Sequence, residues 1–145
     1  MKNLLASWQL WAVLSAAFAA LTAIFAKVGV AGVNSDFATF LRTFIIGVVL
    51  AGMLTWLGEW QSLEGIAPRT YVFLTLSGLA TGASWLCYFR ALQVGDAARV
   101  APIDKLSVVL VALFGVAFLG EKLSPPNWLG VALIAVGATL VAYRG

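Results

Sequence analysis

The sequence has 145 residues, of which 62% are apolar and 10% are charged, whereas soluble domains carry about 25% charged residues. A soluble fold of this length leaves much of its surface exposed, so the composition excludes a soluble enzyme and a disordered chain. Nine basic and six acidic residues are scattered along the sequence, which excludes a nucleic-acid binder with a clustered basic face. The sequence has no histidine and one cysteine. We therefore expect no catalytic residue, no metal site and no cofactor.

Five stretches are apolar enough to cross a membrane, which takes about 20 residues each. They predict helices at residues 4–27, 37–58, 70–91, 98–120 and 126–143. The first stretch resembles a signal peptide. However, its apolar run continues to Ala26, which is longer than the roughly 7–15 residues of the hydrophobic region of a signal peptide. We therefore predict a retained helix. The fold class that follows is an all-α integral membrane protein with one transmembrane domain over residues 1–145.

Five spans place the two termini on opposite sides of the membrane. Side A holds the first and third connections and the C-terminus, and side B holds the N-terminus and the other two connections. The basic residues of connections and tails are Arg99 and Arg144 on side A, and Lys2, Arg69 and Lys122 on side B. When the cations within spans and at their ends are also counted, the balance reverses, with six cations on side A and three on side B. Because such a bias sets orientation, either another feature fixes one orientation or the protein inserts both ways.

The sequence contains no internal repeat, whereas many transporters consist of two halves with inverted topology. A five-span unit is a natural half, since a duplicate of it would enter the membrane inverted. An unfused half would have to pair with an oppositely oriented copy, and a weak charge bias permits this. We therefore expect a dual-topology, antiparallel homodimer.

Several short motifs follow one another in a fixed order. They are Phe25-Ala26-Lys27-Val28-Gly29, Tyr88-Phe89-Arg90-Ala91-Leu92, Ala97-Ala98-Arg99-Val100-Ala101-Pro102, Gly120-Glu121-Lys122-Leu123 and Trp128-Leu129-Gly130. The spacing from Pro102 through the Gly-Glu-Lys turn to the Trp-x-Gly is the most specific feature. With this set, nearly the whole chain resembles a single EamA-type domain of the drug/metabolite transporter superfamily, in its small five-helix form.

The resemblance implies a multi-pass protein of the bacterial or archaeal inner membrane that transports a small metabolite, usually outward, and is not an enzyme. Its expected partners are the metabolite, the lipid bilayer, and a second antiparallel copy or a homologous half. As alternatives we keep a non-catalytic subunit of a heterodimeric flippase-like transporter and a small multidrug transporter that exchanges cations for protons.

Five ionisable residues approach the membrane from side A, where each charge inside a span costs about 3 kcal/mol. Arg42, Asp104 and Lys105 lie within spans, and Lys27 and Arg90 lie at span ends. Four cations against one anion favour an anionic or zwitterionic substrate. The alternatives are that Lys27 and Arg90 extend to the headgroups, that Asp104 caps a helix, and that Lys105 pairs with an acid of a neighbouring helix.

Other candidate residues are apolar or small. Pro102 either interrupts the fourth helix, as in transporters whose broken helices bind substrate, or marks its start. Trp85 and Tyr88 either form an aromatic wall of the translocation path or pack as ordinary side chains. Gly130 and Gly137 permit close helix packing, and we predict that they form the dimer interface, as the resemblance also suggests.

Overall fold

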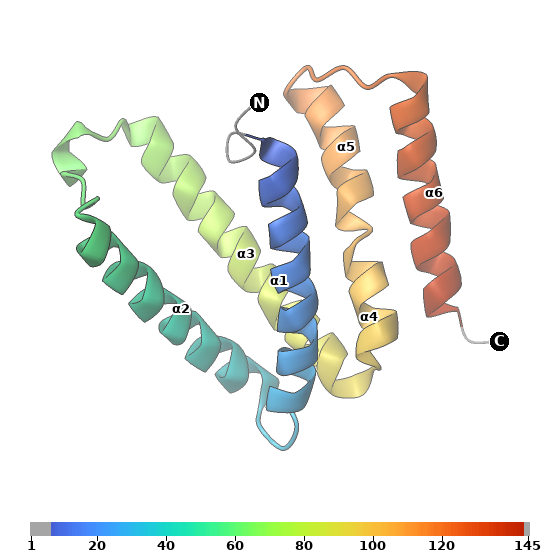
Figure 1. Ribbon diagram of the computed structural model, residues 1–145, viewed down its shortest axis with the longest axis horizontal. Coiled ribbons are helices and arrows are strands. Elements are labelled where there is room, and N and C mark those ends of the chain that lie inside the picture. The colour runs from blue at the N-terminus through green and yellow to red at the C-terminus, as the bar shows by residue number, and fades with distance from the viewer. Residues whose placement is uncertain (1–6, 144–145) are drawn as a thin grey trace. The chain divides into compact units, whose positions relative to one another are not determined.

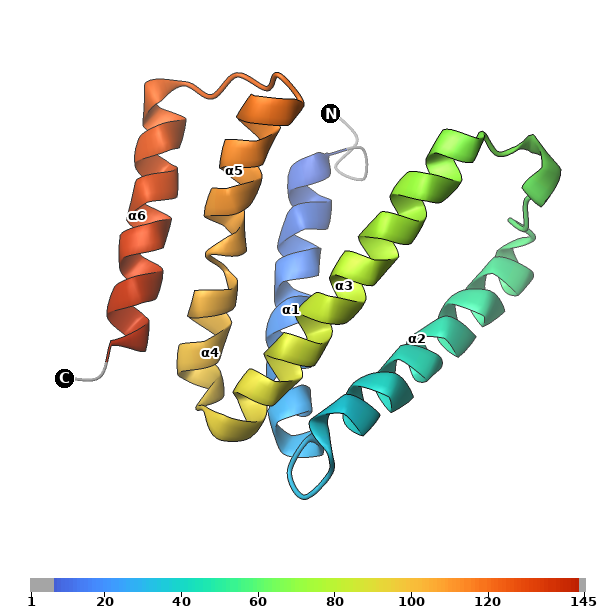
Figure 2. The ribbon, with the colours of Figure 1, turned by 180° about the vertical axis from the view of Figure 1, so that it is seen from behind.

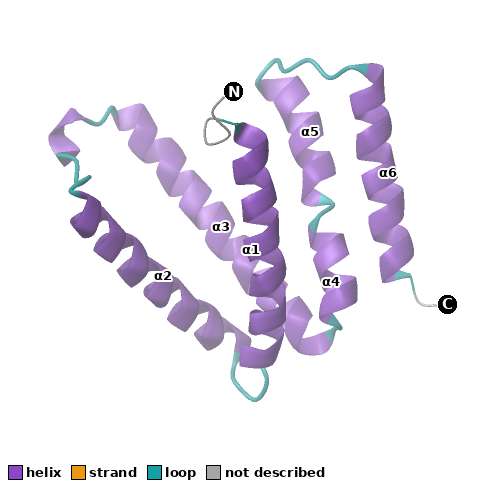
Figure 3. Ribbon diagram, viewed as in Figure 1, coloured by secondary structure: helices purple, strands orange, loops and turns teal. Residues whose placement is uncertain are grey.

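The computed structural model describes residues 7–143, and within these residues it is built from helices and connecting loops, with no strand (Figures 1 and 3). The elements in chain order are α1 (Trp8–Gly29), α2 (Ser35–Leu57), the short 3-10 helix η2 (Leu63–Gly65), α3 (Pro68–Val94), α4 (Ala97–Asp104), α5 (Ser107–Phe118) and α6 (Pro125–Ala142). Residues 4–6 of the first predicted helix, together with Lys2 and Arg144, lie outside the described residues.

Five helical segments are long and apolar enough to span a membrane, and α4 with α5 counts as one of them, Ala97–Phe118. Large apolar side chains are exposed along these segments, including Trp56 at 87% and Phe118 at 80%. Apolar surface on this scale marks a region that contacts lipid or another protein. The predicted fold class, an all-α membrane protein with five spans, is confirmed.

The contacts within the chain define two compact units. One consists of Met1–Phe25 together with Val94–Gly145, and the other is Ala26–Gln93. In the first unit α6 packs along both α4 and α5, as Figures 1 and 2 show from opposite sides. The second unit contains the last turn of α1, α2, η2 and nearly all of α3.

Local hydrogen bonding determines where α2 begins and ends. The Asn34 side chain accepts hydrogen bonds from the backbone N–H groups of Asp36 and Phe37, at 2.9 and 3.1 Å, and so caps the first turn. At the other end Gly58 adopts a left-handed conformation with φ 68°, which glycine adopts without a steric penalty. The Asn34 cap moves the start of the helix to Ser35, two residues before the predicted start.

Four threonine hydroxyl groups within the spans are satisfied by carbonyl groups of their own helices. Thr39, Thr43, Thr81 and Thr139 each donate to the carbonyl oxygen four residues earlier, at 2.8–2.9 Å. Bonding of this kind meets the requirement that polar groups in the membrane find partners within the protein. These threonines are therefore compatible with lipid and need no functional explanation.

The fourth predicted helix is interrupted. It begins at Ala97, and Pro102 lies inside α4, so the alternative in which the helix starts at Pro102 is wrong. Pro102 has no N–H to donate within the helix. Beyond it, the N–H groups of Leu106 and Val108 donate to carbonyls three residues earlier, Ile103 and Lys105, each at 3.0 Å. This tighter bonding separates α4 from α5, and Figure 3 shows the break as a loop segment.

Candidate functional site

Burial in the unit Ala26–Gln93 is concentrated at one end, where the end of α1, the start of α2 and the end of α3 meet. Val30, Phe89 and Leu92 are almost fully buried there, at 1%, 3% and 0% exposure. Two polar residues of α2, Ser35 and Thr39, are also buried there. This end is on side A of the predicted topology, the side on which the sequence gathers its membrane-embedded cations.

Three polar contacts tie the elements together at this end. Arg90 Nη2 and Nε donate to the two carboxylate oxygens of Asp36, at 2.6 and 3.0 Å. Gln93 Nε2 donates to the Val33 carbonyl at 2.9 Å, and Lys27 Nζ donates to the Leu92 carbonyl at 2.6 Å. We call these three contacts the side-A clasp. They link α1, the α1–α2 loop and the first turn of α2 to the last turns of α3.

Two of the predicted site cations, Arg90 and Lys27, have their binding partners within the clasp. Arg90 forms a bidentate ion pair with Asp36, and Lys27 binds a backbone carbonyl. Pairs of this geometry are the strongest class of protein hydrogen bond. The sequence reasoning missed Asp36 and Gln93 as partners, because they lie 54 and 60 residues from the groups they contact. A place for Lys27 and Arg90 in the translocation path stays a prediction.

Arg42 lies deeper in α2, on its eighth residue, and is half-buried. Its guanidinium carbon lies over the Trp85 ring at 4.2 Å from the centroid and over the Phe89 ring at 5.4 Å. Within residues 7–143 no carboxylate comes within ion-pair distance of Arg42. Tyr88, beside Phe89 on α3, is also half-buried. A cation thus sits within a membrane span, against aromatic rings and without a charge partner among the described residues.

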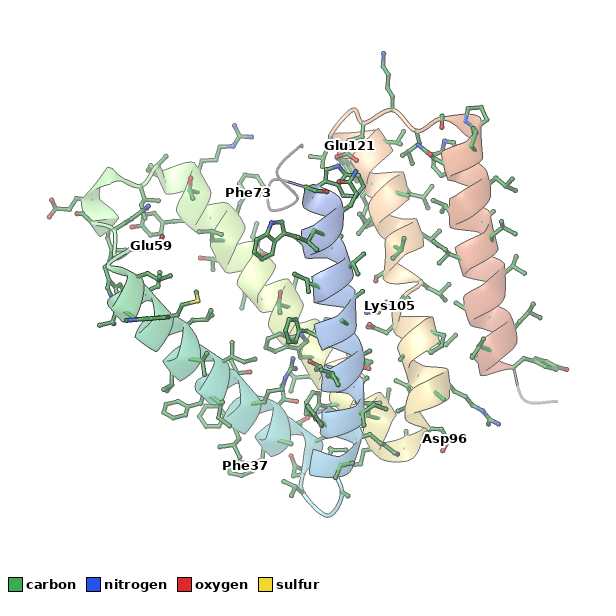
Figure 4. The ribbon with its side chains drawn as sticks, viewed as in Figure 1. Phe37, Glu59, Phe73, Asp96, Lys105 and Glu121 are labelled. Carbon is green, nitrogen blue, oxygen red and sulfur yellow. The ribbon has the colours of Figure 1, made fainter. Side chains whose placement is uncertain are left out.

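The remaining charged candidates belong to the other unit. Lys105 Nζ donates to Asp104 Oδ2 at 3.1 Å. Its partner is therefore the adjacent residue, and the alternative of an acid on a neighbouring helix is wrong. Asp104 is the last residue of α4, and α5 begins after Leu106 without a side-chain cap. The alternative in which Asp104 caps a helix is therefore wrong, and a place for Asp104 and Lys105 in the translocation path stays a prediction. Figure 4 shows Lys105 at the break between the two helices.

Glu121 and Gly115 form a contact that the sequence did not suggest. The Glu121 backbone N–H donates to the Gly115 carbonyl at 3.1 Å, and the left-handed Gly120 precedes it. A Cβ atom on Gly115 would lie 2.5 Å from Glu121 Oε2. Gly115 therefore leaves room for the glutamate side chain at the end of α5, where Figure 4 shows it. The sequence motifs indicate Glu121 only as part of the Gly-Glu-Lys turn and do not indicate Gly115.

Comparison with known proteins decides the family. The model of the EamA-like transporter family matches residues 6–143. The chain belongs to this family. It is 68% identical to an uncharacterized transporter in the cobO 3′ region of a Sinorhizobium species, over 94% of this chain and 96% of that protein. The resemblance stated from the sequence motifs is confirmed, and the chain is a multi-pass membrane transporter protein.

Two of the more distant relatives differ in length: one is much longer than the region matched by this chain, and the other is matched over nearly its whole length. An uncharacterized transporter of Vibrio cholerae is 32% identical over 61% of this chain, but over only 30% of its own length. A probable 4-amino-4-deoxy-L-arabinose-phosphoundecaprenol flippase subunit ArnE of Hamiltonella defensa is 29% identical over 70% of this chain and 92% of its own length. No solved structure matches the chain.

Proposed function

We propose that this chain carries a small anionic or zwitterionic metabolite outward across the bacterial or archaeal inner membrane. It does so by alternating access, as one five-helix domain, with no catalytic activity. The observation that carries the proposal is Arg42, a half-buried cation within α2 that contacts Trp85 and Phe89 and has no carboxylate partner among the described residues. Burying such a charge is costly, and a negatively charged substrate would compensate it during transport.

The working assembly in this proposal is an antiparallel homodimer. Its support is the weak charge bias between the two sides and the large exposed apolar surface of the chain. The small residues Gly130 and Gly137 lie one above the other on α6, with open space where a Cβ would point, and small residues allow helices to approach closely.

A second arrangement also has support. Two relatives that are shorter than this chain are named as probable flippase subunits, which favours a heterodimer with a homologous half as the second candidate. The exchange of cations for protons has less support, because the only acid inside the fourth span, Asp104, is paired with Lys105. Co-purification from native membranes decides between the two assemblies: a second small membrane protein in stoichiometric amount contradicts the homodimer.

Uptake into proteoliposomes tests the transport function. Purified protein is reconstituted and offered radiolabelled organic anions, zwitterions and cations of similar size. We expect saturable uptake of members of the first or second class and none of the third. Correctly folded protein that moves none of the compounds, or that moves only cations, contradicts the proposal.

Gly137→Leu is expected to weaken the dimer at least tenfold, because the added side chain keeps two α6 helices apart. A Cβ atom on Gly137 would meet no atom within 4 Å in the chain, so we expect the monomer to stay folded. Crosslinking over a dilution series in detergent measures the effect. Gly47→Leu, also without neighbours within 4 Å, is the matched control on α2. Equal dimerisation of both variants places the interface elsewhere.

A further inference from the structure

Arg42 has hydrogen-bonding capacity that its contacts do not use. A guanidinium carries five N–H donors at its edges and remains charged at every physiological pH. The rings of Trp85 and Phe89 attract the cation, but they offer no oxygen lone pairs to its N–H groups. Among the side-chain hydrogen bonds of residues 7–143 none has Arg42 as its donor, although Tyr88 interacts with its charge. The donors are therefore available to a planar, oxygen-bearing anion, which the fork of N–H groups fits.

The position of Arg42 limits how much charge it can compensate. It lies seven residues after the start of α2, about 10 Å along the helix axis. One guanidinium neutralises one negative charge. A phosphate monoester carries between about −1.5 and −2 at pH 7, which would leave excess charge within the membrane. A single carboxylate carries one negative charge, which neutralises the one positive charge of Arg42.

The acids of the same unit argue against a zwitterion. Asp36 is held by Arg90 in the side-A clasp. The other two acids of the unit, Glu59 and Glu64, lie beyond the opposite end of α2; Figure 4 shows Glu59 there. An ammonium group bound beside Arg42 would thus find no unpaired carboxylate at this end of the unit, whereas the half-buried Trp85 and Tyr88 suit an apolar body.

We infer that Arg42, placed over Trp85 and Phe89, is the receptor for one carboxylate, and that the transported substrate is a small monocarboxylate with an apolar body. This inference rests on the proposed transport function and chooses the monoanion from the two classes considered there. Arg42 contacts the substrate directly, and the rings of Trp85 and Phe89 position the Arg42 side chain.

The test uses four probes of similar size on the purified full chain: benzoate, its neutral isostere benzamide, the zwitterion phenylalanine, and phenyl phosphate. Ligand binding to the folded state raises the apparent melting temperature, so a concentration series of each probe yields an affinity. We expect benzoate to bind most tightly and benzamide at least tenfold more weakly, because hydrogen bonds to a charged group are lost. Benzamide binding as tightly as benzoate, or tighter binding of phenylalanine or phenyl phosphate, overturns the inference.

Variants assign the binding to the guanidinium. Arg42→Gln should weaken benzoate binding at least tenfold, whereas Arg42→Lys keeps the charge, loses the fork and should have an intermediate effect. Arg69→Gln is the matched control, because Arg69 also lies over a phenylalanine ring, Phe73, at 5.6 Å but at the start of α3. If Arg42→Gln does not fold, the Lys variant carries the test. Unchanged benzoate affinity in Arg42→Lys, or an equal loss in Arg69→Gln, overturns the inference.

Uptake separates this inference from the transport function on which it rests. Arg42-dependent binding of benzoate without uptake of labelled benzoate or of any other compound leaves the receptor in place and contradicts transport. Uptake of other metabolites at the same rate by wild type and Arg42→Gln keeps transport and contradicts the receptor.

Discussion

Exchanging the two charges of the side-A clasp, Asp36→Arg together with Arg90→Asp, is expected to restore most of the transport that either single change removes. Each single reversal places two like charges where a bidentate pair joins α2 to α3, with Nη2 to Oδ2 at 2.6 Å. The ends of the helices should then separate on side A. We expect at least a tenfold fall in proteoliposome uptake for each single variant, in line with the loss of a charge-assisted bidentate pair.

The ion pair should affect transport more than folding. The side chains of Arg90 and Asp36 are 63% and 44% exposed, and exposed pairs contribute about 1 kcal/mol or less to stability. The single variants should therefore purify as folded protein. Recovery in the double variant is incomplete, because Asp36 also stabilises the first turn of α2, where a carboxylate is favourable and a guanidinium is not.

Arg99→Gln provides the control for a charge change on side A. Arg99 and Asp96, at the start of α4, are 4.0 Å apart, which is a long distance for an ion pair. Loss of this weak contact should therefore leave uptake near the wild-type rate. Wild-type uptake in both single clasp variants would show that the clasp takes no part in the transport cycle. A double variant as inactive as the single ones would show that each residue acts by itself and not as a pair.

The spans were predictable because lipid imposes a strict requirement. Every membrane helix needs about 20 apolar residues, and this length is visible in the sequence without knowledge of packing. The exact ends depend on local hydrogen bonds, such as the Asn34 cap that starts α2 at Ser35. The break between α4 and α5 also depends on local bonding, in the turns after Pro102, so its place was not predictable from the proline alone.

The site was predictable only in part. The side of the membrane on which the cations lie follows from counting spans, but their partners do not. Arg42 meets Trp85 and Phe89 only in one register of α2 against α3. Apolar membrane helices lack a clear polar stripe, and the sequence therefore carries little information about which faces meet. Asp36 and Arg90 are 54 residues apart, and neither residue type alone indicates the other as its partner.

Locking the chain in one orientation is expected to abolish transport, and mixing the two locked forms is expected to restore it. Glu59→Lys with Glu64→Lys adds two cations to the exposed α2–α3 connection on side B, and Ala31→Lys with Asp96→Lys adds two to exposed connections on side A. Because Lys and Arg in short loops stay in the cytoplasm, the two double variants should insert in opposite orientations. A reporter fused after Gly145 should signal from both sides in wild type and from one side in each variant.

Activity follows orientation if the working unit is antiparallel. Each locked variant alone can form only parallel pairs, so its uptake in cells should fall at least tenfold, whereas co-expression of both supplies the missing orientation. Glu59→Gln with Glu64→Gln removes the same two acids without adding cations, and this variant should keep both its dual orientation and its activity.

Three outcomes contradict the antiparallel homodimer. A single clean reporter signal in wild type shows that the chain has one orientation. Full activity of either locked variant alone shows that one orientation suffices for transport. Inactive co-expressed variants that are correctly inserted in opposite orientations show that the partner is not a second copy of this chain. The last result would instead favour a heterodimer with a homologous half, the arrangement that the flippase-subunit relatives suggest.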